Sequence, residues 1–404
     1  MSDGAVSTPR HGASPVEVLL AFLRLGLTSF GGPVAHLGYF RAEFVERRRW
    51  LDETAYADIV ALCQFLPGPA SSQTGIALGL LRAGFAGAVC AWIGFTLPSA
   101  VALIAFGYGV GRLGDLTRAP WLHGLKIVAV AVVAQAVWGM ARSLAADRLR
   151  ASLAVAAAVL TLAVPSTWGQ VGAIVFGGLI GWWFLRKDAP SPASLLPLRI
   201  AKVWSIASLA LFFALLAILP LAAGASGNHA VALVDSFYRS GSLVFGGGHV
   251  VLPLLQAEVV PPGWVGNDVF LAGYGAAQAV PGPLFTFSAY LGTVMGPEPN
   301  GWRGGLICLI AIFLPSFLLV VGALPFWNDL RRNAGMQAAL GGVNAAVVGL
   351  LLSALYRPVW TSAIFAPADF GIGIIAFLLL VFWRVPPWLV VILGALGAEG
   401  AASV

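Results

Sequence analysis

The sequence predicts an all-α polytopic membrane protein made of two inverted-topology repeats, with re-entrant or broken helices, joined by one extra transmembrane helix. The first observation is composition: the 404-residue chain is 59% hydrophobic and 10% charged, whereas roughly a quarter of the residues of a soluble protein are charged. The second is that apolar stretches of nearly bilayer-spanning length recur from residue 19 to the C-terminus. The third is an internal duplication.

The duplication has a regular register. Phe30 and Phe245 lie 215 positions apart, and Gln64 and Gln278 lie 214 apart. It covers residues 16–185 and 231–400 and divides the chain into four parts. These are a flexible tail (1–14), a first repeat (15–185), a basic linker with one connecting transmembrane helix (186–230), and a second repeat (231–404).

Each repeat begins with two pairs of short helices. In the first repeat, apolar segments at 16–30 and 34–48 flank Phe30-Gly31-Gly32-Pro33, and segments 53–66 and 70–82 flank Pro67-Gly68-Pro69. Each arm is shorter than the ~20 residues that span a bilayer, so we expect re-entrant hairpins, although fully spanning broken helices stay an alternative. The second repeat has matching interruptions at Phe245-Gly246-Gly247-Gly248 and Pro281-Gly282-Pro283. We call the four interruptions breaks 1 to 4 in chain order.

Loop charges favour inverted over parallel repeats. The loop at 41–50 has four arginines, whereas its counterpart at 256–264 has none, and Lys and Arg collect on the cytoplasmic side. The unpaired helix near Val203–Ala223 would turn the second repeat over. With 41–50 inside, the other basic loops also face the cytoplasm, namely those with Arg142, Arg148, Arg150, Arg186, Lys187, Arg199, Lys202, Arg331, Arg332 and Arg384.

The breaks predict an anion site. A helix that starts after a break has free N–H groups and the positive end of its dipole at its tip, and four such tips near the midplane would bind an anion. The alternative is that Gly and Pro serve close helix packing or kinks. The candidate binding residues of the breaks are Gly31, Gly32, Pro33, Pro67, Gly68, Pro69, Gly246, Gly247, Gly248, Pro281, Gly282 and Pro283.

Arg24 and Arg239 occupy equivalent positions in apolar surroundings, shortly before breaks 1 and 3. An arginine near the membrane centre is costly, about 2.5–3.5 kcal/mol on insertion scales, so the pair is a candidate clamp for a dianion. Alternatively, each arginine extends to an interface or pairs with an acidic residue such as Glu17, Glu43 or Asp235.

Further polar residues near the breaks are candidate ligands or coupling groups. His36 and His249 can donate a hydrogen bond or carry a proton, and a satisfied structural role is the alternative for each. Amides and hydroxyls can donate to an oxyanion, although helical hydroxyls often bond to the preceding turn. The amide and hydroxyl candidates are Gln64, Gln278, Ser71, Ser72 and Thr286, with Thr74 and Ser288 less strongly indicated, and the candidate coupling residues are Glu43, Lys126 and Glu258.

Several function classes are excluded. The chain has no Walker A lysine motif, no HExxH motif and no nucleophile elbow, so it predicts no enzyme, no cofactor and no metal site. Gly109-x-Gly111-x-x-Gly114 follows an apolar span rather than a strand and is not a dinucleotide motif. The net charge of +6 fits basic cytoplasmic loops, and no basic stripe with exposed aromatics indicates nucleic-acid binding.

The chain resembles the chromate ion transporter family in its long, two-domain form. The resemblance lies in segments such as LRLGLTSFGGPVAHLGYFRAEF and QFLPGP of the first half and VFGGGHVVLP and QAVPGP of the second, and it extends over essentially the whole chain. It implies a multi-pass secondary transporter of the cytoplasmic (inner) membrane that exports chromate and confers chromate resistance. Sulfate or another oxyanion is the alternative substrate, and an anion channel is a further alternative. The family's FGGPxxH element falls on Phe30, Gly31, Gly32, Pro33 and His36, whereas the second half has Gly248 and Val251 where Pro33 and His36 stand.

Export of a dianion is electrically favourable. Moving two negative charges out of a negative-inside cell releases roughly 7 kcal/mol at ~150 mV. Membrane potential alone would therefore suffice, while proton coupling through His36, Glu43 or His249 stays open. The expected partners are chromate, sulfate as the alternative, and the lipid bilayer; the oligomeric state is left open, a homodimer included.

Overall fold

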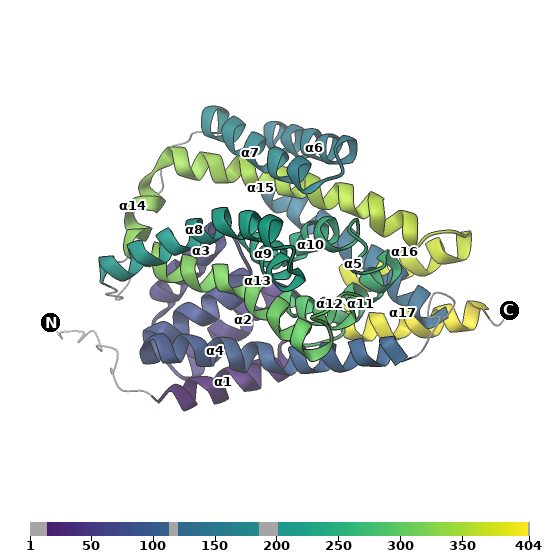
Figure 1. Ribbon diagram of the computed structural model, residues 1–404, viewed down its shortest axis with the longest axis horizontal. Helices are drawn as coiled ribbons and strands as arrows, with labels where there is room; N and C mark the ends of the chain where they lie inside the picture. The colour runs from purple at the N-terminus through teal and green to yellow at the C-terminus, as the bar shows by residue number, and fades with distance from the viewer. Residues whose placement is uncertain (1–13, 113–119, 186–200, 403–404) are drawn as a thin grey trace.

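The structure is a computed structural model that describes residues 14–112, 120–185 and 201–402, and the regular structure in these ranges is helical (Figure 1). The predicted tail up to residue 13 and the linker residues Arg186, Lys187 and Arg199 lie outside the described residues. Most long helices run roughly along the long axis of the molecule in Figure 1, with α1 at the lower edge and α6 and α7 at the top.

The first two helices form a hairpin around break 1. Helix α1 (Pro15–Thr28) is capped by Ser14, whose Oγ accepts a hydrogen bond from the Val16 N–H. Helix α2 (Gly32–Arg41) continues as a π-helix (Ala42–Arg47). The second arm runs back along the first, because Phe22 packs on Phe44 at 4.8 Å between ring centroids and Arg48 reaches Glu17 at 3.5 Å.

A second hairpin surrounds break 2, and a third follows directly. Helix α3 (Glu53–Phe65), capped by Asp52, leads through break 2 into α4 (Ala70–Arg112). Helix α4 folds back at Ala83 and Gly84, where the backbone is not helical. Its two arms lie antiparallel, so close that a Cβ on Gly79 would collide with the carbonyl oxygen of Gly87.

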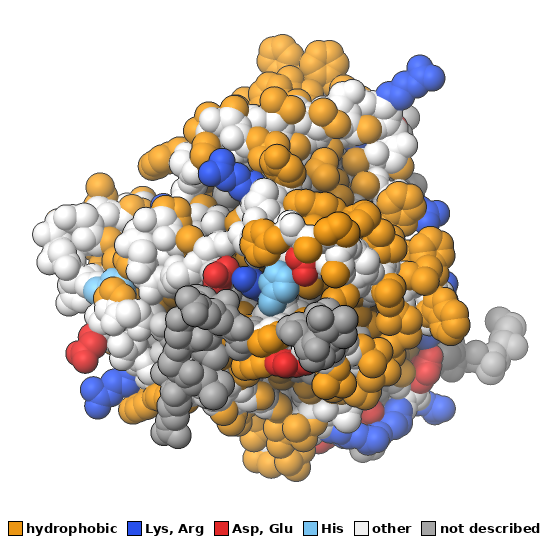
Figure 2. Space-filling view, turned by 90° about the vertical axis from the view of Figure 1, so that its right-hand side faces the viewer, with side chains coloured by type: hydrophobic (Ala, Val, Ile, Leu, Met, Phe, Trp, Pro, Cys, Tyr) orange, Lys and Arg blue, Asp and Glu red, His pale blue; other side chains and the backbone are white. Residues whose placement is uncertain are grey.

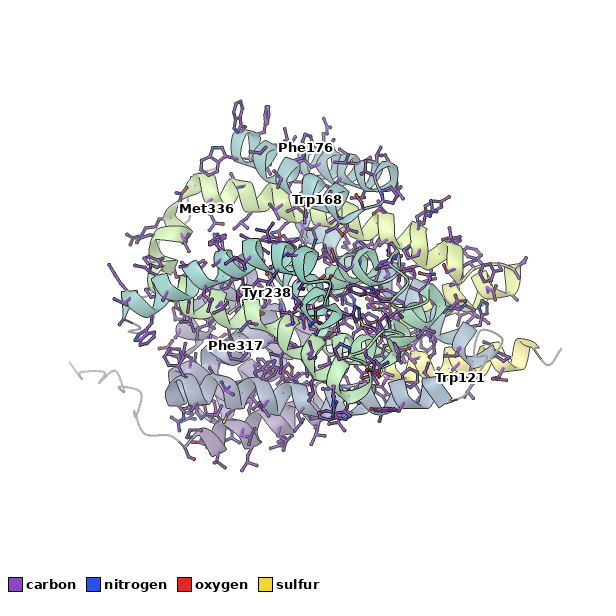
Figure 3. The ribbon with its side chains drawn as sticks, in the orientation of Figure 1. Trp121, Trp168, Phe176, Tyr238, Phe317 and Met336 are labelled. Carbon is purple, nitrogen blue, oxygen red and sulfur yellow. The ribbon has the colours of Figure 1, made fainter. Side chains whose placement is uncertain are left out.

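The remaining helices of the first half pack partly on the second half. They are α5 (Pro120–Leu144), α6 (Arg148–Ala163) and α7 (Thr167–Phe184), followed by the connecting helix α8 (Lys202–Ser226). Helix α8 contacts α9 and α13: the Ser205 hydroxyl donates to the Val321 carbonyl at 2.9 Å, and the Tyr238 hydroxyl donates to the Phe212 carbonyl at 2.9 Å. Tyr238, labelled near the centre of Figure 3, is buried, whereas the labelled Trp168 and Phe176 belong to the outer helix α7.

The second half repeats this order with more interruptions. Its elements are α9 (His229–Ser242), a 3₁₀ turn (Gly248–Val250), α10 (Val251–Val259), α11 (Asn267–Ala277), a 3₁₀ turn (Leu284–Thr286), α12 (Phe287–Val294), α13 (Gly301–Ala323), a 3₁₀ turn (Leu324–Phe326), α14 (Trp327–Arg332), α15 (Ala334–Ala354), a π-helix (Leu355–Val359), a 3₁₀ turn (Trp360–Ser362), α16 (Pro367–Val381) and α17 (Pro387–Ala402).

The two halves exchange helices. Helix α5 packs on α16 and α17, and its counterpart α15 packs on α6 and α7. The contacts are equivalent as well as the helices: a Cβ on Gly124 would lie 2.5 Å from the Gly394 carbonyl oxygen, and one on Gly177 would lie 2.7 Å from that of Gly342. The small residues thus permit backbone contact between the halves at matching positions.

Equivalent helices at the centre run antiparallel to each other. The second arm of α4 and its counterpart α13 lie side by side, with the Trp302 N–H donating to the Tyr108 hydroxyl at 2.9 Å near one end. Farther along, Trp92 packs on Phe317 at 5.8 Å between centroids. Residue numbers therefore rise along one helix as they fall along the other.

Five helices of the described ranges are long and apolar enough to cross a membrane: Ala70–Val110, Pro120–Leu144, Lys202–Ser226, Gly301–Phe326 and Ala334–Ser362. The first of these folds back at Ala83–Gly84, so its second arm alone is the crossing segment. Many large apolar side chains face outward, such as Val203, which is 75% exposed on α8. Figure 2 shows one end of the molecule, with apolar side chains over most of its flanks and charged groups near the middle. The chain is a multi-pass membrane protein.

Candidate functional site

The four breaks meet through backbone hydrogen bonds between the halves. The N–H of Gly68 in break 2 donates to the carbonyl of Val244, beside break 3, at 2.7 Å. The N–H of Gly282 in break 4 donates to the carbonyl of Ser29, beside break 1, at 2.9 Å. Gly68 corresponds to Gly282 and Ser29 to Val244 in the duplication, so the two bonds are symmetry equivalents. The non-helical backbone of each half is satisfied by the other half, as a membrane interior requires.

Glycine is needed at both points because the backbone is left-handed and crowded. The φ angles are +126° at Gly68 and +105° at Gly282. A Cβ on Gly68 would lie 3.0 Å from Ser316 Oγ, and one on Gly282 would lie 2.9 Å from Ser99 Oγ. Ser99 and Ser316 were not among the candidate residues, although each follows a proline in a Leu-Pro-Ser motif that recurs in both halves.

A cavity of about 780 Å³ lies between the two halves beside breaks 1 and 4. Six of the candidate residues line it: Gly31, Gly32, Pro33, His249, Gln278 and Gly282. Sequence reasoning missed Gln135 on α5, and it took Arg384, between α16 and α17, only as a topology marker. The α5 and α16–α17 segments come together through the exchange of helices, which leaves no local signal in the sequence.

The first-half wall of the cavity is the N-terminus of α2. Gly31 precedes this helix with a φ of +100°, and no side chain caps it. The first N–H groups of α2 therefore have no intrahelical partner and carry the positive end of the helix dipole. Since Gly31, Gly32 and Pro33 line the cavity, these groups are available to an anion.

The second-half wall supplies neutral donors. His249 lines the cavity, and its Nδ1 lies 2.8 Å from the hydroxyl oxygen of Tyr274. Gln278 also lines it, and its buried Nε2 has no hydrogen-bond partner among the described residues. An amide nitrogen left without an acceptor in a cavity wall fits a ligand with acceptor oxygens.

The charge of the lining favours anions. Arg384 is exposed in the loop between α16 and α17 and carries a permanent positive charge to the cavity lining. Among the described residues that line the cavity, none is Asp or Glu. An anion there meets a cation and N–H donors without a facing carboxylate.

The two candidate arginines do not come together. Arg24 lies on the exposed face of α1, near Leu20 and Leu27, and does not line the cavity. Arg239 Nη2 is bound by two largely buried carboxylates, at 2.7 Å from Asp235 and 3.0 Å from Glu258. The internal pairing considered for these arginines is what the structure has at Arg239.

The other candidates lie around the breaks and outside the cavity lining. His36 is buried, with Nδ1 3.4 Å from Ser71 Oγ, and the Thr286 hydroxyl donates to the Pro283 carbonyl at 2.7 Å. Gln64 is exposed. The lining also does not include Pro67, Gly68, Pro69, Ser72, Gly246, Gly247, Gly248 or Pro281.

Break 3 is covered where break 1 is open. A Cβ on Gly246 would lie 3.2 Å from Leu144 and 3.3 Å from the terminal methyl of Met140, both near the end of α5. At break 1, a Cβ on Gly31, the counterpart of Gly246, would meet only Ala35 of α2, at 3.1 Å, and one on Gly32 would meet nothing within 4 Å. The two equivalent breaks thus differ in accessibility in this conformation.

The three candidate coupling residues are all ion-paired. Glu43 binds Arg48 at 2.6 Å. Lys126 binds Asp268 at 3.1 Å, and Glu258 accepts a hydrogen bond from the Thr167 hydroxyl at 2.8 Å in addition to its contact with Arg239. Within the described ranges, no group of three His, Cys, Asp or Glu residues could hold a metal ion.

Comparison with known proteins gives a consistent result. A family model described as chromate transporter matches residues 16–182 and again residues 231–398. The chromate transport protein of Pseudomonas aeruginosa is 30% identical over 342 residues, which cover 83% of this chain and 79% of that protein. The chromate transport protein of Cupriavidus metallidurans is 27% identical over 349 residues, 84% of this chain and 81% of that protein. The probable chromate transport protein of Synechococcus elongatus is 27% identical over 343 residues, 83% and 82% of the two chains. No solved structure matches this chain significantly.

Proposed function

The chain belongs to the chromate transporter family in its two-domain form, and from that premise we propose that it exports chromate across the cytoplasmic membrane as a secondary transporter. The oxyanion binds in the cavity between the two halves, and export confers chromate resistance. The observation that carries the proposal is the lining: the free N-terminus of α2, the unpartnered Gln278 amide, and Arg384, with no facing carboxylate among the described residues.

The repeats have inverted topology in this proposal. The antiparallel contact of α13 with the second arm of α4 supports it, because a two-fold axis that relates antiparallel helices is perpendicular to them and lies in the membrane plane. The arginines of segment 41–50 and their absence from segment 256–264 agree, since the two segments then lie on opposite sides. The α1–α2 hairpin enters and leaves the membrane on the cytoplasmic side.

Transport proceeds by alternating access around the breaks. The open state of break 1 and the covering of break 3 by Met140 and Leu144 support a conformation in which one route to the site is closed. In the opposite conformation, the end of α5 moves away from break 3 while break 1 becomes covered. The cross-half hydrogen bonds of Gly68 and Gly282 hold the four breaks at one place during the exchange.

Membrane potential drives export. A dianion leaving a negative-inside cell gains roughly 2.3 kcal/mol per charge per 100 mV, so no coupled ion is needed. Sulfate is the second candidate substrate, because it is a tetrahedral dianion to which the same donors apply. Saturable uptake with competition by sulfate would distinguish this carrier from an anion channel.

Chromate uptake into inside-out vesicles tests the site through Arg384. We expect Arg384→Ala to raise the KM for chromate about tenfold, because loss of a charged donor to the oxyanion costs about 1.5 kcal/mol. Arg384→Lys retains the charge, so its KM for chromate should lie between those of wild type and Arg384→Ala. Arg150→Ala is the matched control, since Arg150 pairs with Asp147 outside the cavity. A wild-type KM in Arg384→Ala would remove this residue from the site.

A further inference from the structure

His249 and Tyr274 form a hydrogen bond at the wall of the cavity. His249 stands in the 3₁₀ turn Gly248–Val250 after break 3, and Tyr274 is on α11, fully buried. Their Nδ1 and hydroxyl oxygen are 2.8 Å apart. His249 reaches the cavity and Tyr274 does not, so the tyrosine can act on a bound ligand only through the histidine.

The direction of this hydrogen bond follows from the tyrosine's single proton. A phenol has one O–H donor, and within the described residues this contact is the one hydrogen bond of the Tyr274 hydroxyl. If Nδ1–H donated to the tyrosine, the phenolic proton would be buried without an acceptor, which proteins avoid. The hydroxyl therefore donates and Nδ1 accepts.

The accepting Nδ1 fixes the rest of the imidazole. A neutral histidine carries one proton, so Nε2 bears it when Nδ1 is an acceptor. The alternative tautomer would present the Nε2 lone pair to an anion, which is repulsive. The geometry of the tyrosine and the charge of the ligand thus favour the same tautomer, with Nε2–H as a donor.

Gln278 adds a second donor one helical turn away. It follows Tyr274 by four residues and is the residue directly after the end of α11. Gln278 lines the cavity, and its Nε2 is buried without a partner among the described residues. The tyrosine position corresponds to Val60 in the first half, where Gln64 is exposed, so this arrangement is confined to one half.

We infer that Tyr274 is a positioning residue that holds His249 as an Nε2–H donor, and that His249 and Gln278 form a carboxylate-free subsite of N–H donors selective for fully deprotonated tetrahedral dianions. The inference rests on the proposed function and names the ligand class of that same cavity. Chromate and sulfate offer acceptor oxygens alone and satisfy both donors. Phosphate near neutral pH keeps a hydroxyl proton, and the described lining has no carboxylate to accept it.

A double-mutant cycle on the purified full chain tests the positioning role. Sulfate binding is measured by calorimetry for wild type, Tyr274→Phe, His249→Gln and the double variant. We expect Tyr274→Phe to weaken binding about tenfold, because the histidine loses the hydroxyl that fixes its tautomer. His249→Gln should itself weaken binding, because its flexible amide replaces the positioned imidazole N–H donor. In the His249→Gln background, Tyr274→Phe should then change binding less than twofold.

The outcomes separate the two levels of the argument. An equal tenfold loss from Tyr274→Phe in both backgrounds would show a packing effect and overturn the positioning role, and thermal unfolding of the same variants would register that effect. Phosphate binding as tight as sulfate binding at pH 7 would overturn the selectivity of this carboxylate-free subsite. If the wild-type protein binds neither chromate nor sulfate, the proposed function itself fails. If the wild-type protein binds sulfate but the effects of Tyr274→Phe and His249→Gln are additive, only the positioning role fails.

Discussion

Arg239 and Arg24 stand at equivalent positions and have different surroundings, because Leu20 stands in place of Asp235 and Glu43, the counterpart of Glu258, is bound by Arg48. Asp235, one turn before Arg239, accepts a hydrogen bond from the Arg239 Nη2 at 2.7 Å. The counterpart of Asp235 in the first half is the exposed Leu20. Glu258 is the second carboxylate bound to the Arg239 Nη2, at 3.0 Å. Arg239 therefore neutralises buried carboxylates, while Arg24 lies on an apolar exposed face.

Arg239→Ala should destabilise the protein strongly. It leaves Asp235 and Glu258 buried without a counter-ion, which costs about 3–5 kcal/mol for a broken buried pair. Arg24→Ala, at the equivalent exposed position, should stay within about 0.5 kcal/mol of wild type. Unfolding of the detergent-solubilised variants would measure both. Normal stability of Arg239→Ala together with lost export would instead assign Arg239 a role in transport.

Gly68→Ala and Gly282→Ala should abolish transport in a folded protein. Each adds a Cβ at a left-handed φ and within 3.0 Å of a buried serine oxygen, so the break must move and its hydrogen bond to the other half is lost. Gly227→Ala is the control, since Gly227 has a φ of +60° with open space around it. The φ penalty alone, about 1–2 kcal/mol, applies to all three. Export rates of Gly68→Ala and Gly282→Ala equal to that of Gly227→Ala would contradict a role for the close contact.

At the scale of helices, the breaks and their equivalence between the two repeats could be predicted from the sequence, because glycine and proline interrupt a helix at their own positions. Breaks 1 and 3 separate arms that run back on each other, as the contact of Phe22 with Phe44 demonstrates in the first half. The cavity's remaining wall was not predictable in this way. Gln135 and Arg384 come together because α5 packs on α16 and α17 of the other half, and exchange between repeats is a tertiary arrangement without a local pattern.

The asymmetry of the breaks predicts different reactivity of two matched cysteines. Ala35 lines the cavity, whereas its counterpart Val250 is fully buried. In a background without Cys63, Cys90 and Cys308, we expect Ala35→Cys to react with a small polar thiol reagent much faster than Val250→Cys. Chromate or sulfate should slow the first reaction. Equal rates, or no protection by either anion, would indicate that the cavity beside break 1 is not the substrate site.

At the scale of the whole molecule, the antiparallel α4 and α13 lead to a topology that can be measured. Residues 45 and 260 occupy equivalent positions of the two repeats, the first in the π-helix Ala42–Arg47 of the arginine-rich segment 41–50 and the second directly after α10. We expect Val45→Cys to be labelled from the cytoplasmic side and Val260→Cys from the opposite side, because inverted repeats place equivalent loops on opposite faces. Labelling of both from one side would mean parallel repeats.

The central claim is electrogenic export of chromate through the cavity between the repeats, and uptake of chromate into inside-out vesicles tests it most directly. The vesicles contain the wild-type chain and receive an imposed lumen-positive potential, with and without a pH gradient. We predict saturable uptake driven by potential alone and inhibited by sulfate. Uptake that requires the pH gradient would assign proton coupling, with His36, Glu43 and His249 as the first groups to test. Uptake no faster than in vesicles without the protein would contradict chromate transport by this chain.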